Sequence, residues 1–394
     1  MLLPALAVLS TVLWTGAEEL PENEFQASFN GYFDNFHVNI LYPTFSLTKR
    51  ISPTTSLTGR YLVDAITAAS MRSRYEIDGI TSATTRQGVD AVTSASARAG
   101  REDQPAFDEV RHEITAGLTK LVGEGSVSAN ALYSTEHDYT SKTLAGQLTV
   151  PFALKNTVLQ AGAVRSWDKV FPDTRTWKRN KNVLTFSGGL TQVLGKRAIL
   201  QINGSYSKST GYLSDPYQPV PILSGDSYRY HETVLPDLRI RNAVGARVNV
   251  QLNALSSLQL GYRYYWDDWK IDSDTYNVFY QRYVSDRAFT LGLGFRHYVQ
   301  TRAGFFKAEY TAVEKYMTVD SKLNSCFSDE IEFNLDIDGS RLKYDSFMGF
   351  LYSDRTRYFL KLNFYRRHNP IPDWFSGYRD LYAYIVSIGF RYRL

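Results

Sequence analysis

The chain ends in Tyr384-Ile385-Val386-Ser387-Ile388-Gly389-Phe390-Arg391-Tyr392-Arg393-Leu394. Every even position in this segment carries an aromatic or aliphatic side chain, whereas most odd positions carry serine, glycine or arginine. Successive side chains of a β-strand point to opposite faces, so this strand has one apolar and one polar face. Such a strand suits the wall of a transmembrane β-barrel, where one face meets lipid and the other a wet interior.

The same period of two recurs over 244–252, 258–264, 289–296 and 358–364, with Phe359 as an exception. A single alternating strand would also fit a soluble β-sandwich, but the recurrence favours a barrel. No stretch approaches the roughly 18 consecutive apolar residues of a membrane-spanning helix. We therefore expect an all-β, antiparallel transmembrane barrel.

The alternation predicts sixteen strands, over 24–34, 38–51, 55–66, 109–121, 125–136, 138–152, 156–167, 182–194, 197–209, 237–252, 256–267, 270–284, 286–299, 341–352, 356–367 and 380–394. Segments 303–315 and 329–338 also alternate, so counts from 14 to 18 fit the pattern. Connections after even-numbered strands are short, at 122–124, 153–155, 195–196, 253–255 and 353–355. Long connections follow odd-numbered strands, at 67–108, 168–181, 210–236, 300–340 and 368–379. Short periplasmic turns and long extracellular loops are the rule for outer-membrane barrels.

Both ends of the chain carry patterns typical of exported proteins. Residues 1–17 read as a secretory signal peptide, with an apolar run followed by the small residues Thr15-Gly16-Ala17, which leaves 18–394 as a single barrel domain. Ser387, Gly389, Tyr392 and Leu394 resemble the terminal recognition pattern of outer-membrane proteins, with Leu in place of the usual Phe. We expect secretory export, insertion by the barrel assembly machinery and residence in the lipid of a bacterial outer membrane.

The composition narrows the function classes. Aromatic residues make up 14% of the chain, which suits aromatic girdles at the membrane surfaces. The net charge of +4 is dispersed, so nothing indicates a nucleic-acid partner. The lone cysteine, Cys326, fits an exported protein without disulfides. No Ser/His/Asp order, P-loop or dinucleotide-binding glycine motif stands out, so we do not expect an enzyme.

An eight-residue repeat lies within 63–96. Its copies begin at Val63, Ile77 and Val89, fourteen and then twelve residues apart. Each copy combines a carboxylate, an apolar residue and a hydroxyl-rich run of small residues. A duplication of ordinary loop or strand-end material would give such a repeat, and so would a recurring ligand site.

The chain from about residue 25 to 394 resembles a family of uncharacterised bacterial outer-membrane β-barrels, a domain of unknown function. The resemblance rests on Tyr61-Leu62-Val63-Asp64-Ala65-Ile66-Thr67, Ser134-Thr135-Glu136-His137-Asp138-Tyr139-Thr140-Ser141, Pro236-Asp237-Leu238-Arg239, and Tyr262-Arg263-Tyr264-Tyr265 leading into Asp268-Trp269. Members of that family tend to be encoded near flavin transferases, which implies a link to extracytoplasmic redox chemistry. Asp274 departs from the family pattern, which would have His there.

The repeat also resembles the covalent flavin-attachment motif, in which a hydroxyl forms a phosphoester with flavin mononucleotide (FMN). The acceptors implied are Ser70, Thr84 and Ser96, with Asp64, Asp78 and Asp90 as the motif carboxylates. Thr84 is the leading acceptor, and the first copy departs because Ala68 stands where Gly or Ser is expected. A purely structural repeat and another ligand site are the alternatives. Because the loop lies outside the cell, a periplasmic flavin transferase would have to act before the barrel inserts.

Two acidic turns stand out as candidate metal sites. Glu136-His137-Asp138 is expected to be a solvated turn, because neighbouring side chains of a strand point apart. The second turn, 267–272, supplies only three carboxylates, fewer than the six to eight oxygen ligands of calcium. We therefore expect no metal site.

Basic side chains occupy inward positions of several predicted strands: Arg241, Arg247, Arg263, Arg296, Lys361, Arg391 and Arg393. The lumen near the first four is expected to be electropositive, unless acidic loops fold inward and pair with them. An electropositive pore would prefer anions. Three functions stay open at this point. The first is solute passage, and the second is a role in an extracytoplasmic redox system, which would need a redox partner and could use covalent FMN. The third is a structural or adhesive role at the surface.

Overall fold

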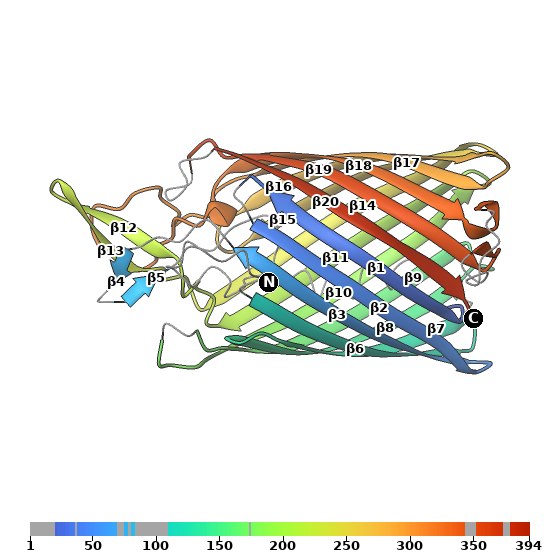
Figure 1. Cartoon of the computed structure of the whole chain (residues 1–394), viewed down its shortest axis with the longest axis horizontal. Coiled ribbons are helices and arrows are strands. Elements are labelled where there is room, and N and C mark those ends of the chain that lie inside the picture. The colour runs from blue at the N-terminus through green and yellow to red at the C-terminus, as the bar shows by residue number, and fades with distance from the viewer. Residues whose placement is uncertain are drawn as a thin grey trace.

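The computed structural model describes residues 20–35, 38–68, 75–77, 80–82, 109–172, 175–342, 352–372 and 379–394. Sixteen strands form a closed antiparallel barrel (Figure 1). They are β1 (Glu24–Asp34), β2 (Val38–Ser52), β3 (Thr55–Ala68), β6 (Glu109–Val122), β7 (Gly125–Thr135), β8 (Tyr139–Phe152), β9 (Thr157–Val170), β10 (Arg179–Gly195), β11 (Ala198–Gly211), β14 (Leu238–Asn253), β15 (Ser256–Asp267), β16 (Asp272–Val284), β17 (Phe289–Gln300), β18 (Cys326–Asp338), β19 (Thr356–His368) and β20 (Asp380–Arg393). The predicted fold class and strand number are confirmed.

Two small hairpins lie outside the barrel wall, at the end that carries the long loops (Figure 1). They are β4 (Tyr75–Ile77) with β5 (Ile80–Ser82), and β12 (Pro219–Ser224) with β13 (Ser227–Glu232). In the part of the chain that the structure describes, no helix has the length and apolar character needed to cross a membrane.

The first and last strands close the barrel. β1 pairs antiparallel with β20 along its whole length, from Glu24 opposite Arg393 to Asp34 opposite Ala383. The rings of Phe25 and Phe390 lie 6.0 Å apart across this seam. Closure matters because a lipid-exposed sheet edge would leave backbone N–H and C=O groups without partners.

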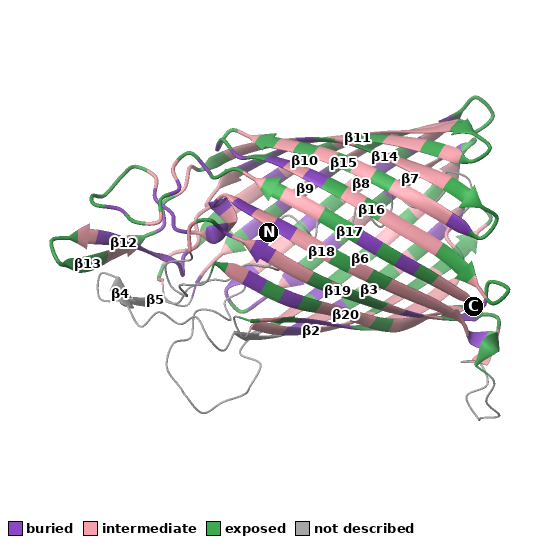
Figure 2. Cartoon of the chain, turned by 90° about the horizontal axis from the view of Figure 1, so that it is seen from above, coloured by how far each residue is buried: buried purple, intermediate pink, exposed green. Residues whose placement is uncertain are grey.

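The alternation read from the sequence separates two faces of the wall. On β17, Leu293 and Phe295 are 57% and 47% exposed on the outer face, whereas the glycines between and before them face inward. Figure 2 shows the alternation of exposed and less exposed residues along the wall. Near the loop end the outer face carries tyrosines whose hydroxyls donate to acids: Tyr262 to Asp274 at 2.6 Å and Tyr264 to Asp272 at 2.9 Å. Asp274 therefore belongs to the outer aromatic girdle.

One predicted strand was misplaced. The fourteenth strand of the barrel is β18, Cys326–Asp338, and not 341–352; residues 339–341 form a turn of 3₁₀-helix, and 343–351 lie outside the described residues. β18 pairs with both β17 and β19, so no place remains for a further strand between them. The alternating segment 303–315 is part of a loop. The connection between β18 and β19 thus spans 339–355, much longer than the turn predicted at 353–355.

The remaining turns fall where they were predicted. Gly123 takes a positive φ of 60° between β6 and β7, and Ala153, Leu154 and Lys155 all take positive φ between β8 and β9. The opposite end of the barrel carries the connections after β3, β9, β11, β17 and β19. Apart from the long connection between β18 and β19, loops and turns are therefore segregated to the two ends, as in outer-membrane barrels.

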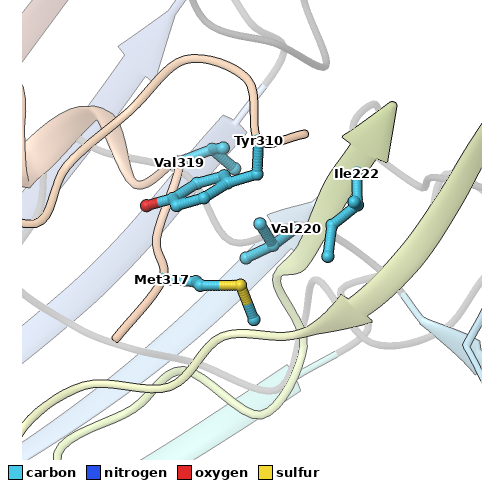
Figure 3. Close-up of a cluster of buried hydrophobic side chains, with 5 residues drawn as sticks. All are labelled: Val220, Ile222, Tyr310, Met317 and Val319. Atoms are coloured by element: carbon cyan, nitrogen blue, oxygen red, sulfur yellow. The ribbon is translucent and has the colours of Figure 1, made fainter. Parts of the chain in front are cut away.

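Two of the long loops fold together into one unit, here called the cap: the β12–β13 hairpin and segment 301–325. Its apolar centre consists of Val220, Ile222, Tyr310, Met317 and Val319 (Figure 3). The Tyr310 hydroxyl donates to the Phe305 carbonyl at 2.7 Å and accepts from the Thr318 N–H at 2.9 Å. Burial in this cluster raises the pKa of Tyr310. The cap is thus a folded element with its own small core. Its two segments lie in the chain between β11 and β14 and between β17 and β18, and these strands connect it to the barrel.

Candidate functional site

A cavity of about 540 Å³ lies inside the barrel, in its loop-side half. Its charged lining comprises six basic side chains and one carboxylate: Arg239, Arg241, Arg263, Arg296, Lys322, Arg367 and Glu330. Four tyrosines also line it, Tyr32, Tyr265, Tyr298 and Tyr365. We call this space the arginine cavity. The excess of cations gives it a positive potential, which attracts anions.

The strand ladder brings these arginines together from different strands. Arg239 at the start of β14 donates through Nε and Nη2 to Asp267 Oδ2, at 2.8 and 2.5 Å. Its guanidinium also lies 4.3 Å from the centroid of the Trp269 ring. Arg263 on β15 lies over the ring of Tyr265, 5.6 Å from its centroid. Aromatic faces and a carboxylate therefore hold these guanidinium groups in place.

Segment 321–323 covers the cavity from the loop side. It forms a short 3₁₀-helix that carries Lys322, and its Leu323 is buried against Trp269, Ile271, Ala303 and Phe306. The side chain of Gln300 at the end of β17 donates to the carbonyls of Lys322 and Asn324, at 2.9 and 2.7 Å. The cap is therefore attached to the barrel wall next to the arginines.

A second, smaller cavity of about 230 Å³ adjoins the first and shares Arg263 with it. Arg247 lines it together with four amide side chains, Gln147, Gln160, Asn203 and Asn277. No aspartate or glutamate of the described chain lines it. Both cavities therefore offer anions a cationic surface.

The facing part of the lumen wall, on β3 and β6 to β9, carries buried carboxylates. They are Asp64 on β3, Glu113 on β6 and Asp168 on β9, with Glu136 and Asp138 in the turn between β7 and β8. Arg111 forms ion pairs with Asp64 and, at 3.9 Å, with Glu136. The Ser141 hydroxyl donates to Asp168 at 2.7 Å. Carboxylates thus predominate in this sector, although Arg111 lies among them, and arginines predominate around the arginine cavity, although Glu330 lines it. Such an uneven distribution sets up an electric field across the lumen.

The turn at Glu136-His137-Asp138 is not the solvated turn that was expected. Glu136 and Asp138 are 7% and 4% exposed. The loop after β11 folds back over this turn, so the Tyr217 hydroxyl donates a hydrogen bond to Asp138. Among the residues described, no group of three or more His, Cys, Asp or Glu side chains could hold a metal ion.

The basic residues predicted to line the lumen separate into three groups. Arg241, Arg263 and Arg296 line the arginine cavity, and Arg247 lines the smaller one. Lys361, Arg391 and Arg393 line neither cavity; Arg391 lies over the Phe359 ring, and Arg393 donates to Glu22 at 2.7 Å. The carboxylates that pair with Arg296 and Arg393 come from strand β18 and from the segment before β1, and neither comes from a loop.

Sequence reasoning missed Arg239, Lys322, Arg367 and Glu330. The period of two could have found Arg367, because it shares a face with Lys361, Asn363 and Tyr365 on β19. Lys322 comes from a loop, where no periodicity reports the direction of a side chain. Glu330 belongs to the strand that was assigned to the wrong segment.

The repeat is only partly described by the structure. Asp64 of the first copy lies on β3 and forms an ion pair with Arg111. Ser70, Asp78, Thr84, Asp90 and Ser96 lie outside the described residues, as does the predicted signal peptide at 1–17. Covalent attachment of FMN to this repeat stays a prediction.

Comparison with solved structures found barrels with low sequence identity. The siderophore receptor PirA from Pseudomonas aeruginosa matches at a TM-score of 0.45 and 11% identity, covering 89% of this chain and 57% of the receptor. The chain thus spans little more than half of that receptor. A bacterial polysaccharide outer membrane secretin matches at 0.47 and 7%, covering 95% and 100%. OpdK from Pseudomonas aeruginosa, solved with vanillate, matches at 0.43 and 10%, covering 95% and 99%.

The comparison with curated proteins found no match. The sequence does match a protein family, over residues 3–182 and 165–331, which together make up most of the chain. The quoted segments 61–67, 134–141, 236–239 and 262–265 all lie within these ranges. The chain is therefore an outer-membrane type β-barrel that belongs to the family described as "Protein of unknown function (DUF3570)".

Proposed function

We propose that this barrel passes small anions across a bacterial outer membrane. The observation that carries the proposal is the lining of the arginine cavity, in which six basic side chains face one carboxylate. Rings of basic side chains lower the barrier for anions and raise it for cations. The exposed apolar outer face and the closed ladder support residence in a membrane, because a β-barrel satisfies its backbone polar groups internally.

The two charged sectors of the wall add a second argument. The buried carboxylates Asp64, Glu136, Asp138 and Asp168 are held by Arg111, Ser141 and Tyr217, and none of them lines the arginine cavity. An anion in the lumen is therefore attracted to the arginine cavity and not to this sector of the wall. The redox and adhesive alternatives have no comparable support among the described residues, since the predicted flavin acceptors lie outside them.

The test is the reversal potential of the refolded full-length barrel in a planar bilayer under a KCl gradient. We expect stepwise conductance with chloride more permeant than potassium. The double variant Arg263→Gln, Arg296→Gln should move the reversal potential towards zero, because it removes two charges from the cavity lining. A preference for potassium in the unmodified protein, or a complete lack of conductance, would overturn the proposal.

A matched control is Arg366→Gln. Arg366 lies on the outer face of β19, where it pairs with Asp380 at 3.0 Å. Its substitution removes one positive charge of the same kind without touching the lumen. The reversal potential of this variant should equal that of the unmodified barrel.

A further inference from the structure

The smaller cavity owes its shape to glycines that face the lumen on two pairs of adjacent strands, which β11 separates. They are Gly162 on β9, Gly189 on β10, Gly245 on β14 and Gly261 on β15. Each lies directly opposite larger polar residues of the adjacent strands: Gln147 opposite Gly162, Gln160 and Asn203 opposite Gly189, Asn203 and Arg263 opposite Gly245, and Arg247 and Asn277 opposite Gly261. The glycines leave the space into which these side chains extend.

The surroundings of Gly189 show that side chains fill this space closely. A Cβ at position 189 would lie 3.2 Å from Oδ1 of Asn203 and 3.4 Å from Oε1 of Gln160. Two amide groups thus meet over a position where any larger residue would press against them. We call the cavity the amide pocket.

The cations of the amide pocket are available for an anion. Arg247 makes no ion pair or side-chain hydrogen bond with another described residue, and Arg263 contacts the face of Tyr265. No carboxylate of the described chain lines the pocket. Guanidinium groups withdrawn from bulk water in this way are best satisfied by a carboxylate, which can accept two parallel hydrogen bonds.

An unsatisfied acceptor gives a second, independent indication of a ligand. Gln147 is 8% exposed, and its Oε1 atom has no hydrogen-bond partner among the described residues. The other end of the same amide makes only a long contact of 3.4 Å, from Nε2 to Thr149 Oγ1. A buried acceptor needs a donor, and an anion alone cannot supply one. A hydroxyl group on the ligand would supply this hydrogen-bond donor.

We infer that the amide pocket binds a hydroxylated carboxylate about the size of a monosaccharide, such as a sugar acid. Arg247 and Arg263 would take the carboxylate, and Gln147 would accept from a hydroxyl. The volume of about 230 Å³ lies below the ~300–1,000 Å³ of pockets for larger organic ligands, which limits the ligand to a small one. The inference rests on the proposed passage of anions and names the class of solute.

The test is isothermal titration calorimetry on the detergent-refolded full-length protein. The probes are D-glucuronate, D-glucose, which lacks the charge, and acetate, which lacks the hydroxyls. We expect D-glucuronate to bind at least tenfold more tightly than either of the other two. Equal binding of D-glucose would overturn the role of the arginines, equal binding of acetate would overturn the role of Gln147, and no binding of D-glucuronate would overturn the site.

Variants locate the binding within the barrel. Arg247→Gln and Gln147→Leu should each weaken D-glucuronate binding at least tenfold. The control is Arg391→Gln, a lumen-facing arginine that lies over Phe359 and does not line the pocket, and it should leave binding unchanged. Heat-modifiable migration on gels reports whether each variant is folded. An equal loss in the Arg391 variant would overturn the assignment to this pocket.

The calorimetric result is separate from the conductance result. Chloride preference without D-glucuronate binding would overturn this inference and leave the proposed function standing. D-glucuronate binding in a barrel that prefers potassium would overturn the proposed function and leave the pocket standing.

Discussion

Arg296 of β17 lies directly across the strand ladder from Glu330 of β18, with 3.5 Å between Nη1 and Oε2. Glu330 is the only carboxylate among the described residues that line the arginine cavity. It also accepts a hydrogen bond from the Asn363 amide. The wall therefore holds one acidic group inside a basic surface, and this group partly offsets the attraction for anions.

We expect Glu330→Gln to increase the preference for chloride. One elementary charge about 7 Å from a permeating ion contributes roughly 0.6 kcal/mol at the dielectric constant of water, which is a factor of about three in permeability. The measurement is the chloride-to-potassium permeability ratio from reversal potentials. An unchanged or smaller ratio would show that permeating ions do not pass near Glu330.

The C-terminal segment should be required for assembly. Deletion of residues 390–394 removes the pairing of Phe390 with Ala27 and Tyr392 with Phe25, and with it one end of the closing seam. We expect loss of the barrel, measured as loss of heat-modifiable migration and of protein in the outer-membrane fraction. Deletion of the β12–β13 tip, residues 224–227, is the control and should assemble normally. Normal assembly of the C-terminal deletion would contradict both the terminal recognition pattern and the role of the seam.

The outer face of β17 should tolerate no charge. Leu293 is 57% exposed in the middle of that face, so Leu293→Arg would place a cation in lipid. We expect a loss of about 2–4 kcal/mol in the free energy of unfolding from lipid vesicles. The control is Thr290→Arg on the same strand, which faces the lumen opposite Asp336 and should cost much less. Equal costs at the two positions would mean that the wall is not embedded in lipid as described.

The cap should depend on its small apolar core. Met317 is 2% exposed in the cluster with Val220, Ile222, Tyr310 and Val319, and truncation of a buried methionine to alanine costs about 2–5 kcal/mol. We expect Met317→Ala to speed trypsin cleavage within 301–325, while the barrel itself stays resistant. Val313→Ala is the control, because Val313 is 62% exposed in the same segment. Cleavage rates that do not differ would show that the cluster does not hold the cap closed.

The repeat supplies a test of covalent flavin. The chain would be co-expressed with a flavin transferase, and in-gel fluorescence after denaturation would report a covalent flavin. We expect any such signal to disappear in the triple variant Ser70→Ala, Thr84→Ala, Ser96→Ala, with Thr84 as the main acceptor in peptide mapping. Persistence of fluorescence in the triple variant would move the attachment elsewhere. A complete lack of fluorescence in protein from the native host would leave the repeat a structural one.

Most of the wall was predictable because lipid on one side and water on the other impose a period of two. β20 and β17 carry it almost without exception. β18 was passed over although its segment 329–338 alternates, because the choice of 341–352 kept the following connection, 353–355, as short as the rule for outer-membrane barrels requires. β18 carries acids on both faces: Asp329 points outward and pairs with His297 at 2.7 Å, whereas Glu330 points inward. Asp329 lies near the loop end, where the outer face belongs to the aromatic girdle and carries acids as well as apolar residues. Alternation of polar and apolar residues therefore no longer separates the outer face from the inner face there.

The site was only partly predictable. The inward arginines of β14, β15 and β17 follow from alternation within single strands, but which of them share a cavity depends on the register between strands. Contacts made by loops carry no periodic signal at all. The hydrogen bond from Tyr217 to Asp138 joins residues 79 positions apart, and its effect, the burial of an acidic turn, could not be read from either segment.

The pairing of β1 with β20 also determines when folding can finish. Glu24 and Arg393 are neighbours in the seam although almost the whole chain lies between them. The loop that must close before these strands meet is therefore nearly as long as the molecule, and such non-local contacts form slowly. The nascent polypeptide cannot complete its interior while synthesis is still under way. Until the last strand arrives, every intermediate exposes an unpaired edge, and such an edge is prone to pair with other chains.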